Sequence, residues 1–589
     1  MNLKAKPKFV DGRNKIKLKY DPTLDGNFTD FGIDKFKIFS GFEKNFKNLV
    51  KPTPSQRRIL SVLNSKISCV NQNKQGTGNS FALVLYALSL EGLHGEVSSL
   101  IIVQNELLVK QYKEIFDKFL QNYPKDKDNK VQYLYRSDEM VELEQETLLS
   151  KITPHILVST PHRLLDIICK HPDDPNYIHL KTLKFLACDD ADTLLIDHGK
   201  KINKKRATEI LIDYINDLRE KVVNNPPLQY CFMSSVDITD KVMRLVTDKK
   251  WAADRPILPI GIPSLKSYRF EPAKRLPNYI SISPILVTSS KNHQERIKFF
   301  DLKTSDLANN LESIKKIRSP VGKEFDENYK RYRVKNRGKL PKILLDSLPQ
   351  FLENSNSKSE KALLIVPENV SSLKISNYLK EKFDIFAEPI NQLEFSKLSN
   401  LFVSTDMETQ FSALNPQFVI ATSAQVAGLT LPGLKKIVCL GIDSVVDSSS
   451  LVLLGGRFRL NENGLINDEH YNTTDKLRSI EGEANISLLY PKSAFSIIER
   501  YAFERIILKS GIIKIHPLMN EFEPTDLSTY KELFEEDGDI FEKLQQKFEE
   551  NMKIEENKYD LFSFRNEKGG KIKSQGPSNV SGILPEENE

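Results

Sequence analysis

Short apolar runs alternate with longer helix-like segments along two stretches of the chain. The first stretch covers residues 28–262, and the second covers residues 342–516. Most of the runs are continuous in apolar residues, which is typical of strands buried on both faces of a parallel sheet. The clearest strand candidates are residues 67–70, 100–103, 156–159, 185–189, 230–233, 362–366, 418–422 and 437–440. The pattern therefore predicts two successive α/β units with parallel sheets.

The segments outside these units differ from them in composition. Residues 1–27 form a basic arm, in which neither an amphipathic targeting helix nor the apolar centre of a secretion signal is evident. Residues 263–341 are expected to be a linker or insertion, and their part from Tyr329 to Lys339 combines cations with two tyrosines. Residues 517–589 form an acidic tail with a charged helical pattern, and we expect its Gly- and Ser-containing end to be disordered.

Charge is distributed unevenly along the chain. Residues 521–589 hold 18 acidic and 9 basic residues, a net charge of −9. The first 520 residues therefore carry +15, because the whole chain carries +6. A basic body indicates a polyanionic partner, whereas an acidic tail is typical of a solubilising or self-shielding segment.

Composition excludes several classes of protein. Hydrophobic residues make up 39% and charged residues 28% of the chain, as in ordinary globular proteins. The apolar run 81–90 has about half of the roughly 20 residues that a membrane-spanning helix needs, so we expect no membrane span. The five cysteines form no CxxC pair, so neither a disulfide framework nor a zinc site is predicted, and a reducing compartment is favoured.

A glycine-containing loop follows the first strand candidate and precedes the helical segment 81–90. Gly76 and Gly78 would allow backbone N–H groups to turn toward an anion, and the Ser80 hydroxyl is placed to bind Mg²⁺. A phosphate-binding loop of this kind has lysine before the Ser or Thr, where this chain has Asn79. Taken alone, such a loop is more often a plain turn.

Seven segments, one of which contains this loop, together indicate what the loop does. They are 51–56 (KPTPSQ), 73–80 (NKQGTGNS), 158–166 (VSTPHRLLD), 185–192 (FLACDDAD), 232–236 (FMSSV), 421–434 (ATSAQVAGLTLPGL) and 454–459 (LGGRFR). In order and approximate spacing they resemble the motifs of the DEAD-box RNA helicase family over roughly residues 28–510. The resemblance implies two tandem RecA-like domains with ATP in the cleft between them and RNA lying across both.

The resemblance also implies roles for individual residues. Phe28 or Phe31 corresponds to the outlying aromatic of the adenine site. The other implied nucleotide contacts are Gln56, Gly76, Thr77, Gly78, Asn79 and Ser80, with Ser80 and Asp189 holding Mg²⁺ through water. Asp189, Asp190 and Arg459 correspond to catalytic positions, and Asp192 and Ser234 to the pair that couples nucleotide state to domain closure. Thr160, Arg163, Gln111, Thr422 and Gly428 correspond to RNA-contacting positions.

The departures from the family pattern fall on the residues of hydrolysis. Asn79 replaces the phosphate-binding lysine, which removes a charge-assisted contact of roughly 1.5–3 kcal/mol. Asp190 replaces the glutamate that polarises the attacking water, and Gly456 replaces the first arginine finger, a residue typically worth roughly 10³–10⁵ in rate. Thr430 replaces the ribose-contacting aspartate and Ala427 the arginine in the same motif.

We expect hydrolysis to be absent or feeble. Bound ATP or ADP with Mg²⁺ and no nucleotide at all both remain compatible with the residues.

Two cationic residues, Lys74 and Arg457, lie close in sequence to Asn79 and Gly456. No spacing supports either as a substitute for the missing catalytic cations, and we expect both to be solvated loop residues.

The RNA contacts of the family are altered as well. Gln104-Asn-Glu-Leu107 stands where the family has Pro-Thr-Arg-Glu, and the Gly-Gly expected near Arg136 is missing. New cations are available in the lysine-rich run 200–206 and in the arm 329–339, where Lys330, Arg331 and Arg333 are candidate RNA contacts beside stacking tyrosines.

Three functions fit the sequence. The first is a scaffold that binds RNA, ribosomal or messenger, or ribonucleoprotein proteins, in ribosome assembly, RNA processing or translation, and has lost its ATPase. The second is a slow ATP-dependent RNA helicase, and the third is a protein-interaction adaptor that does not bind RNA. Degenerate members of the family point to the mitochondrial matrix or the nucleus and nucleolus, and the sequence does not predict an oligomeric state.

Overall fold

A computed structural model describes most of the two predicted units. The described residues are 18–33, 45–46, 51–73, 75–90, 92, 95–121, 127–174, 177–195, 205–222, 227–235, 240–249, 251–252, 257–260, 280–289, 297–301, 340–354, 361–402, 416–445, 448–458 and 484–491. The basic arm as far as residue 17, the arm 329–339 and the acidic tail lie outside these ranges, and so do Lys74 and Arg459.

The first domain is built on a parallel sheet of seven strands in the order β3-β4-β2-β5-β6-β1-β7. The strands are β1 (Ser68–Gln72), β2 (Ser99–Ile102), β3 (Val131–Leu134), β4 (Ile156–Ser159), β5 (Phe185–Cys188), β6 (Gln229–Ser234) and β7 (Ile257–Ile260). The side chains of β2, β4, β5 and β6 are buried throughout, as their continuous apolar sequences predict. Because the strands are parallel, the loop after β1 and the loop after β5 lie at the same edge of the sheet.

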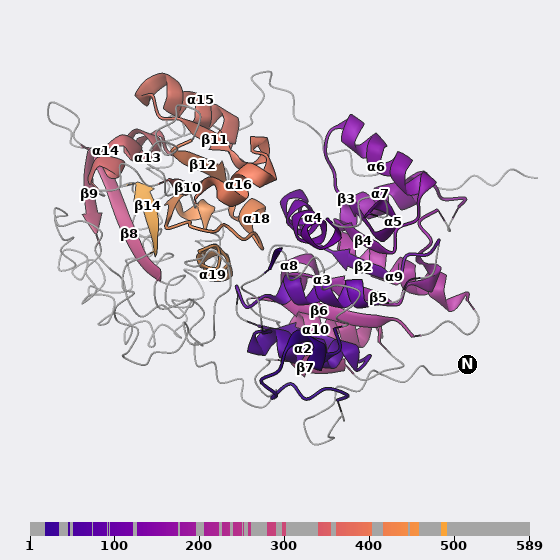
Figure 1. The fold of residues 1–589 in the computed structure, drawn as a ribbon. Helices are drawn as coiled ribbons and strands as arrows, with labels where there is room; N and C mark the ends of the chain where they lie inside the picture. Colours follow the sequence, from indigo (N-terminus) through magenta and orange to yellow (C-terminus); the bar gives the residue numbers. More distant parts are fainter. Residues whose placement is uncertain are drawn as a thin grey trace, which may run out of the picture.

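Helices cover this sheet on both faces (Figure 1). In chain order they are η1 (Phe28–Phe31), α2 (Pro54–Asn64), α3 (Asn79–Ser89), α4 (Glu106–Leu120), α5 (Lys127–Lys130), α6 (Glu139–Lys151), α7 (Pro161–Lys170), η3 (Leu180–Thr182), α8 (Ala191–Leu195), α9 (Ala207–Glu220) and α10 (Asp240–Asp248). Side chains cap the N-termini of several of these helices. Thr53 caps α2, with Pro54 in the first turn, and Asn105 caps α4 by accepting a hydrogen bond from the Leu108 N–H at 2.9 Å.

The second domain repeats the architecture with the sheet order β11-β12-β10-β13-β14-β8-β9. Its strands are β8 (Ile280–Ser289), β9 (Ile297–Asp301), β10 (Ala362–Ile365), β11 (Ala387–Pro389), β12 (Phe418–Ala421), β13 (Lys436–Leu440) and β14 (Ala484–Pro491). Its helices are α13 (Lys342–Asp346), α14 (Leu348–Asn354), α15 (Ser372–Phe383), η4 (Ile390–Gln392), α16 (Phe395–Leu401), α18 (Ser423–Val426), η5 (Ile442–Ser444) and α19 (Ser448–Gly455). Strand pairing is parallel except between β8 and β9. The two tandem α/β domains that the sequence predicts are thus confirmed.

The second domain begins earlier in the chain than the sequence suggests. The sequence predicts a linker or insertion over residues 263–341, but β8 pairs with β14 along its length from Ile280 to Val287, and β9 completes the edge. Serines and Pro284 interrupt the apolar residues of β8, which makes the segment look polar in the sequence. Ile282 and Ile285 of this strand are nevertheless fully buried.

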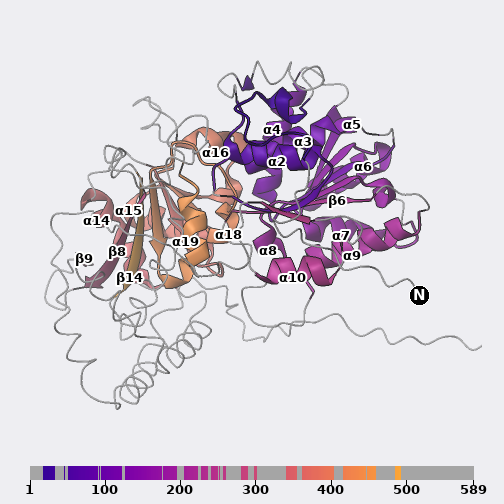
Figure 2. The ribbon, with the colours of Figure 1, turned by 90° about the horizontal axis from the view of Figure 1, so that it is seen from below.

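The two domains share a continuous apolar core. One cluster of buried residues extends from α2, α3 and α4 of the first domain to β10, β12 and β13 of the second. Helix α4 lies beside α16 and α18 of the second domain (Figures 1 and 2). Among the helices that the structure describes, none has the length and apolar character needed to cross a bilayer.

Candidate functional site

The loop after β1 has the backbone of a phosphate-binding loop. Gly76 has φ +76°, and Gly78, the residue that immediately precedes α3, has φ +83°. This left-handed conformation is strained for residues with a Cβ, so both glycines have a structural reason to be present. The loop ends at the N-terminus of α3, as the sequence predicts.

Asn79 does not project into the cleft as the lysine it replaces would. Its side-chain oxygen accepts hydrogen bonds from Asn73 Nδ2 at 3.2 Å and from Thr77 Oγ1 at 3.3 Å. The amide is therefore held within its own loop, and it stabilises that loop without supplying a positive charge.

The glutamine of the first motif also makes contacts inside the protein. Gln56 Oε1 accepts a hydrogen bond from the Thr53 N–H at 2.8 Å, and Gln56 Nε2 donates one to the Gly78 carbonyl at 3.2 Å. Thr53 Oγ1 donates to the Thr77 carbonyl at 2.7 Å, so α2 is attached to the phosphate loop at two points. Phe31 is fully buried and Phe28 is 1% exposed, so neither ring has an open face for stacking on a base in this structure.

Asp189 lies at the carboxyl end of β5, opposite the phosphate loop. Its Oδ2 accepts hydrogen bonds from Ser80 Oγ at 2.6 Å and from Tyr112 OH at 2.7 Å. Burial raises the pKa of Asp189 above its usual value, and burial together with the Asp189 charge raises the pKa of Tyr112. The sequence segments that resemble the family motifs miss Tyr112, because none of them contains residue 112.

Asp190 follows in a left-handed conformation with φ +62°. Its Oδ1 accepts a hydrogen bond from Ser235 Oγ at 3.1 Å. Burial, followed by the charges of Asp189 and Asp192, raises the pKa of Asp190 to about 8. Asp192 and Ser234 are both buried, and their role in coupling the domains stays a prediction.

Arg457 is not the solvated cation that the sequence suggests. It is 2% exposed, and its Nε donates to the Leu453 carbonyl at 2.9 Å while its Nη1 donates to the carbonyls of Val426 and Leu429. Its Nη2 reaches the first domain and donates to Gln75 Oε1 at 3.2 Å. The positive charge of Arg457 acts on Asp189 and Asp190, whose pKa values it lowers against the larger effect of burial. Solvated loop cations make no such contacts, so this expectation was wrong.

Gly456, at the position of the first arginine finger, lies directly against the phosphate loop. A Cβ at Gly456 would overlap the side chain of Gln75. The side chain of Gln75 thus occupies the space that any side chain at position 456 would need.

Two further side chains of the first domain contact the second. Gln111 Oε1 accepts a hydrogen bond from the Thr430 N–H at 2.7 Å, and Asn105 Nδ2 donates to the Ala424 carbonyl at 3.1 Å. The family resemblance makes Gln111 an RNA contact, but it is 7% exposed and its amide is engaged with the second domain. Thr422 is also engaged within the protein, since its side chain caps α18. Gly428 packs against Leu108 and Asp190 with φ +78°.

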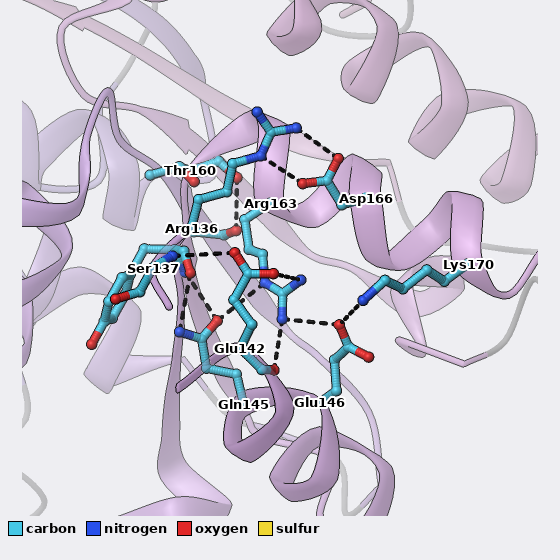
Figure 3. Close-up of polar contacts among 11 residues, drawn as sticks. Arg136, Ser137, Glu142, Gln145, Glu146, Thr160, Arg163, Asp166 and Lys170 are labelled. Atoms are coloured by element: carbon cyan, nitrogen blue, oxygen red, sulfur yellow. Dashed lines mark hydrogen bonds and ion pairs between the residues drawn. The ribbon is translucent and has the colours of Figure 1, made fainter. Parts of the chain in front are cut away.

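Arg163, another expected RNA contact, is enclosed by α6 (Figure 3). Its guanidinium forms ion pairs with Glu142 and Glu146, both at 3.0 Å, and donates to Gln145 Oε1 at 3.3 Å. The Arg163 side chain has no exposed area, so in this structure it neutralises protein carboxylates rather than facing an open surface. Thr160, at the start of the same helix, is 7% exposed.

Several expected residues cannot be placed in this arrangement. Arg459, Lys330, Arg331 and Arg333 lie outside the described residues, so their catalytic and RNA-binding roles stay predictions. Within the part of the chain that the structure describes, no group of three or more His, Cys, Asp or Glu residues is arranged to hold a metal ion.

The donor set fits only part of a magnesium nucleotide. Ser80 and Asp189 provide the hydroxyl and carboxylate that Mg²⁺ prefers. In the phosphate loop itself, however, Gln75 accepts a hydrogen bond from Arg457, and the side chain of Asn79 is hydrogen-bonded to Asn73. The cleft in this structure therefore does not fit the triphosphate end of a nucleotide.

Comparisons with known proteins relate the first domain to a known family. Residues 53–231 match the family model described as DEAD/DEAH box helicase. The chain is 29% identical over 192 residues to the ATP-dependent rRNA helicase SPB4 of Debaryomyces hansenii, a match that covers 29% of this chain and 30% of that protein. It is 26% identical over 194 residues to the mitochondrial translation ATP-dependent RNA helicase mrh5 of Schizosaccharomyces pombe, which covers 30% of this chain and 32% of that protein. The matches therefore span about a third of the length of these relatives.

Solved structures share the fold of both domains. The structure of Mss116p bound to ssRNA and AMP-PNP superposes with a TM-score of 0.53 at 15% identity, covering 92% of this chain and 88% of that one. The structure of Mss116 bound to ssRNA and UDP-BeF gives the same TM-score and identity, with 92% and 89% coverage. The RecA-like architecture predicted from the sequence is thereby confirmed.

The raised pKa of Asp190 predicts a pH-dependent stability difference. Between about pH 4 and the folded-state pKa of about 8, the folded protein retains a proton that the unfolded chain releases, so the free energy of unfolding falls as the pH rises. In Asp190→Asn this contribution is absent, so the variant should gain stability relative to the wild type from pH 5 to pH 8. The gain should be on the order of 1 kcal/mol per pH unit in urea denaturation. The exposed control Asp173→Asn should show no such trend, and a pH-independent difference for Asp190→Asn would contradict the account.

The Arg163 cluster predicts a contrast between two arginines. Arg163→Ala removes a fully buried cation from Glu142 and Glu146, of which Glu146 keeps Lys170, and should cost about 3 kcal/mol of unfolding free energy. Arg136→Ala removes an exposed pair with Asp166 and should cost about 0–1 kcal/mol. Urea denaturation at neutral pH measures both, and equal costs would show that the enclosure of Arg163 by α6 is not maintained in solution.

Proposed function

We propose that this chain, whose first domain belongs to the DEAD/DEAH box helicase family, is an RNA- or ribonucleoprotein-binding scaffold that has lost nucleotide-driven turnover. The observation that carries the proposal is the direct contact of Gln75 with Gly456 and Arg457. Turnover in this family needs a finger arginine and a phosphate-loop cation, and this chain has Gly456 and Asn79 at those positions. The two residues that remain for Mg²⁺, Ser80 and Asp189, are bonded to each other at 2.6 Å.

The charge of the chain supports RNA as the partner. The first 520 residues carry a net +15, and the segment from Tyr329 to Lys339 contains six cations and no carboxylate. Neutralising phosphates with such cations is the main source of sequence-independent affinity for nucleic acids. The enclosed Arg163 and engaged Gln111 indicate that binding depends on these added cations rather than on the helicase motifs.

The relatives suggest the process in which the scaffold acts. One is an rRNA helicase and another a mitochondrial translation helicase, so we place the chain in ribosome assembly, RNA processing or translation. Its location would then be the nucleolus or the mitochondrial matrix.

A slow ATP-dependent helicase is the second candidate. It is favoured by the retained Ser80 and Asp189 pair and by the carboxylate of Asp190 at the catalytic position. In this case Mg²⁺ and ATP would bind after Gln75 moves away from Gly456, and misplacement of the shorter Asp190 by about 1 Å would slow hydrolysis on the order of 10²-fold.

An ATPase assay separates the two candidates. The purified chain with single-stranded RNA should release no more phosphate from ATP than Asp189→Asn does, because Asn79 and Gly456 stand where the family has a lysine and the first finger arginine. Asp189→Asn retains acceptors for Ser80 and Tyr112 and serves as the folded control. RNA-stimulated turnover in the wild type that Asp189→Asn abolishes would establish the helicase and exclude the scaffold.

RNA binding should be independent of nucleotide and steeply dependent on salt. In filter binding without ATP, the triple variant Arg331→Ala, Arg333→Ala, Lys335→Ala should lower the slope of log affinity against log salt by about 0.7 for each RNA phosphate that the variant no longer neutralises. The matched triple variant Lys543→Ala, Lys547→Ala, Lys553→Ala in the acidic tail should leave the slope unchanged. If the wild type does not bind RNA at low salt, the scaffold gives way to a protein-interaction adaptor.

A further inference from the structure

We infer that the two domains close on each other through their own side chains, without nucleotide or RNA. The contacts that do this form a set that we call the cleft bridge: Gln75, Asn105 and Gln111 of the first domain, and Arg457 with the backbone of residues 424–430 of the second. The inference goes beyond the proposed function, because it holds whether or not the chain binds RNA.

The first part of the bridge is the fit of Gln75 against Gly456. Gln75 is 5% exposed, and its oxygen lies where a Cβ of residue 456 would be. An arginine at position 456, as the family has, could not coexist with this arrangement. The absence of the finger side chain therefore makes room for a side chain from the opposite domain.

The second part is the cation of Arg457. The carbonyls of Leu453, Val426 and Leu429 hold its guanidinium from the second domain and leave Nη2 to bond Gln75. Its charge lies within electrostatic range of the buried Asp189 and Asp190. Arg457 therefore joins the second domain to the phosphate loop of the first through this hydrogen bond.

The third part is a pair of amide side chains at α4. Gln111 accepts a hydrogen bond from the Thr430 N–H, and Asn105 donates to the Ala424 carbonyl while also capping its own helix. Both bonds go to backbone groups that would be exposed in an open cleft. Leu108, 1% exposed between these two residues, packs on Gly428, so the polar contacts surround an apolar one.

These contacts occur where the chain departs from its family. Asn105 belongs to the segment Gln104-Asn-Glu-Leu107 that replaces Pro-Thr-Arg-Glu, and Thr430 and Gly456 replace an aspartate and an arginine. Positions that contact ligands in the family contact the opposite domain here. Closure thus becomes a property of the folded chain, and a triphosphate would have to displace Gln75 from Arg457.

Energy transfer between two dyes can test the closure. One dye is placed on the native Cys169, the exposed cysteine of α7, and the other on Asn377→Cys, an exposed position of α15. The nucleotide-free protein should show one predominant high-transfer population, and adding Mg²⁺ with AMP-PNP should leave it unchanged. A nucleotide-free protein that is predominantly open, and that closes only with AMP-PNP and RNA, would overturn the inference.

Variants of the bridge identify the residues responsible. Gln75→Ala and Gln111→Ala should each lower the ratio of closed to open molecules about fivefold, the effect expected for one buried hydrogen bond. Gly456→Ala should lower the ratio more than Gln75→Ala does, because its Cβ meets Gln75, and adding Gln75→Ala should relieve part of that effect, since the Cβ of residue 75 remains. Gln392→Ala, at an exposed glutamine of the second domain, is the control. Circular dichroism identifies any variant that fails to fold, and bridge variants that match Gln392→Ala would contradict the assignment.

Discussion

Two adjacent buried carboxylates at the carboxyl end of β5 are the constraint on which this structure depends. Asp189 is 8% exposed and Asp190 is 6% exposed, and polar groups at such depth need hydrogen-bond partners. Ser80, Tyr112 and Ser235 provide the hydrogen bonds from the first domain. The nearby positive charge comes from the second domain through Arg457. Domain closure and the electrostatics of this buried pair are thus linked.

Under the proposed function, the fold persists although the residues of hydrolysis are replaced. The sheets, the glycine conformations of the phosphate loop and the buried aspartates all support the fold itself, so they remain useful without turnover. Asn79 now stabilises its own loop, and Gly456 accepts Gln75. We interpret the site as one in which contacts to ligands have been exchanged for contacts within the protein.

The sequence predicts the two sheets well because parallel strands are buried on both faces and have continuous apolar sequences. Strands β4 and β10 begin where their runs begin. Strand β8 was missed because serines and a proline interrupt its apolar residues, and it lies far in sequence from its partner β14. The motifs located Asp189 and the phosphate loop, but sequence alone could not show which partners their side chains have. Arg457, Arg163 and Gln111 illustrate this limit, since their burial results from contacts between segments distant in the chain.

Closure without nucleotide is the central claim, and the amide of Thr430 reports on it directly. In the structure this N–H donates to Gln111 Oε1 across the cleft at 2.7 Å. Hydrogen exchange of the Thr430 amide, measured on the full chain without nucleotide or RNA, should be strongly protected and should speed up in Gln111→Ala. Exchange at the rate of an exposed loop in the wild type, with protection only after AMP-PNP and RNA are added, would contradict the account.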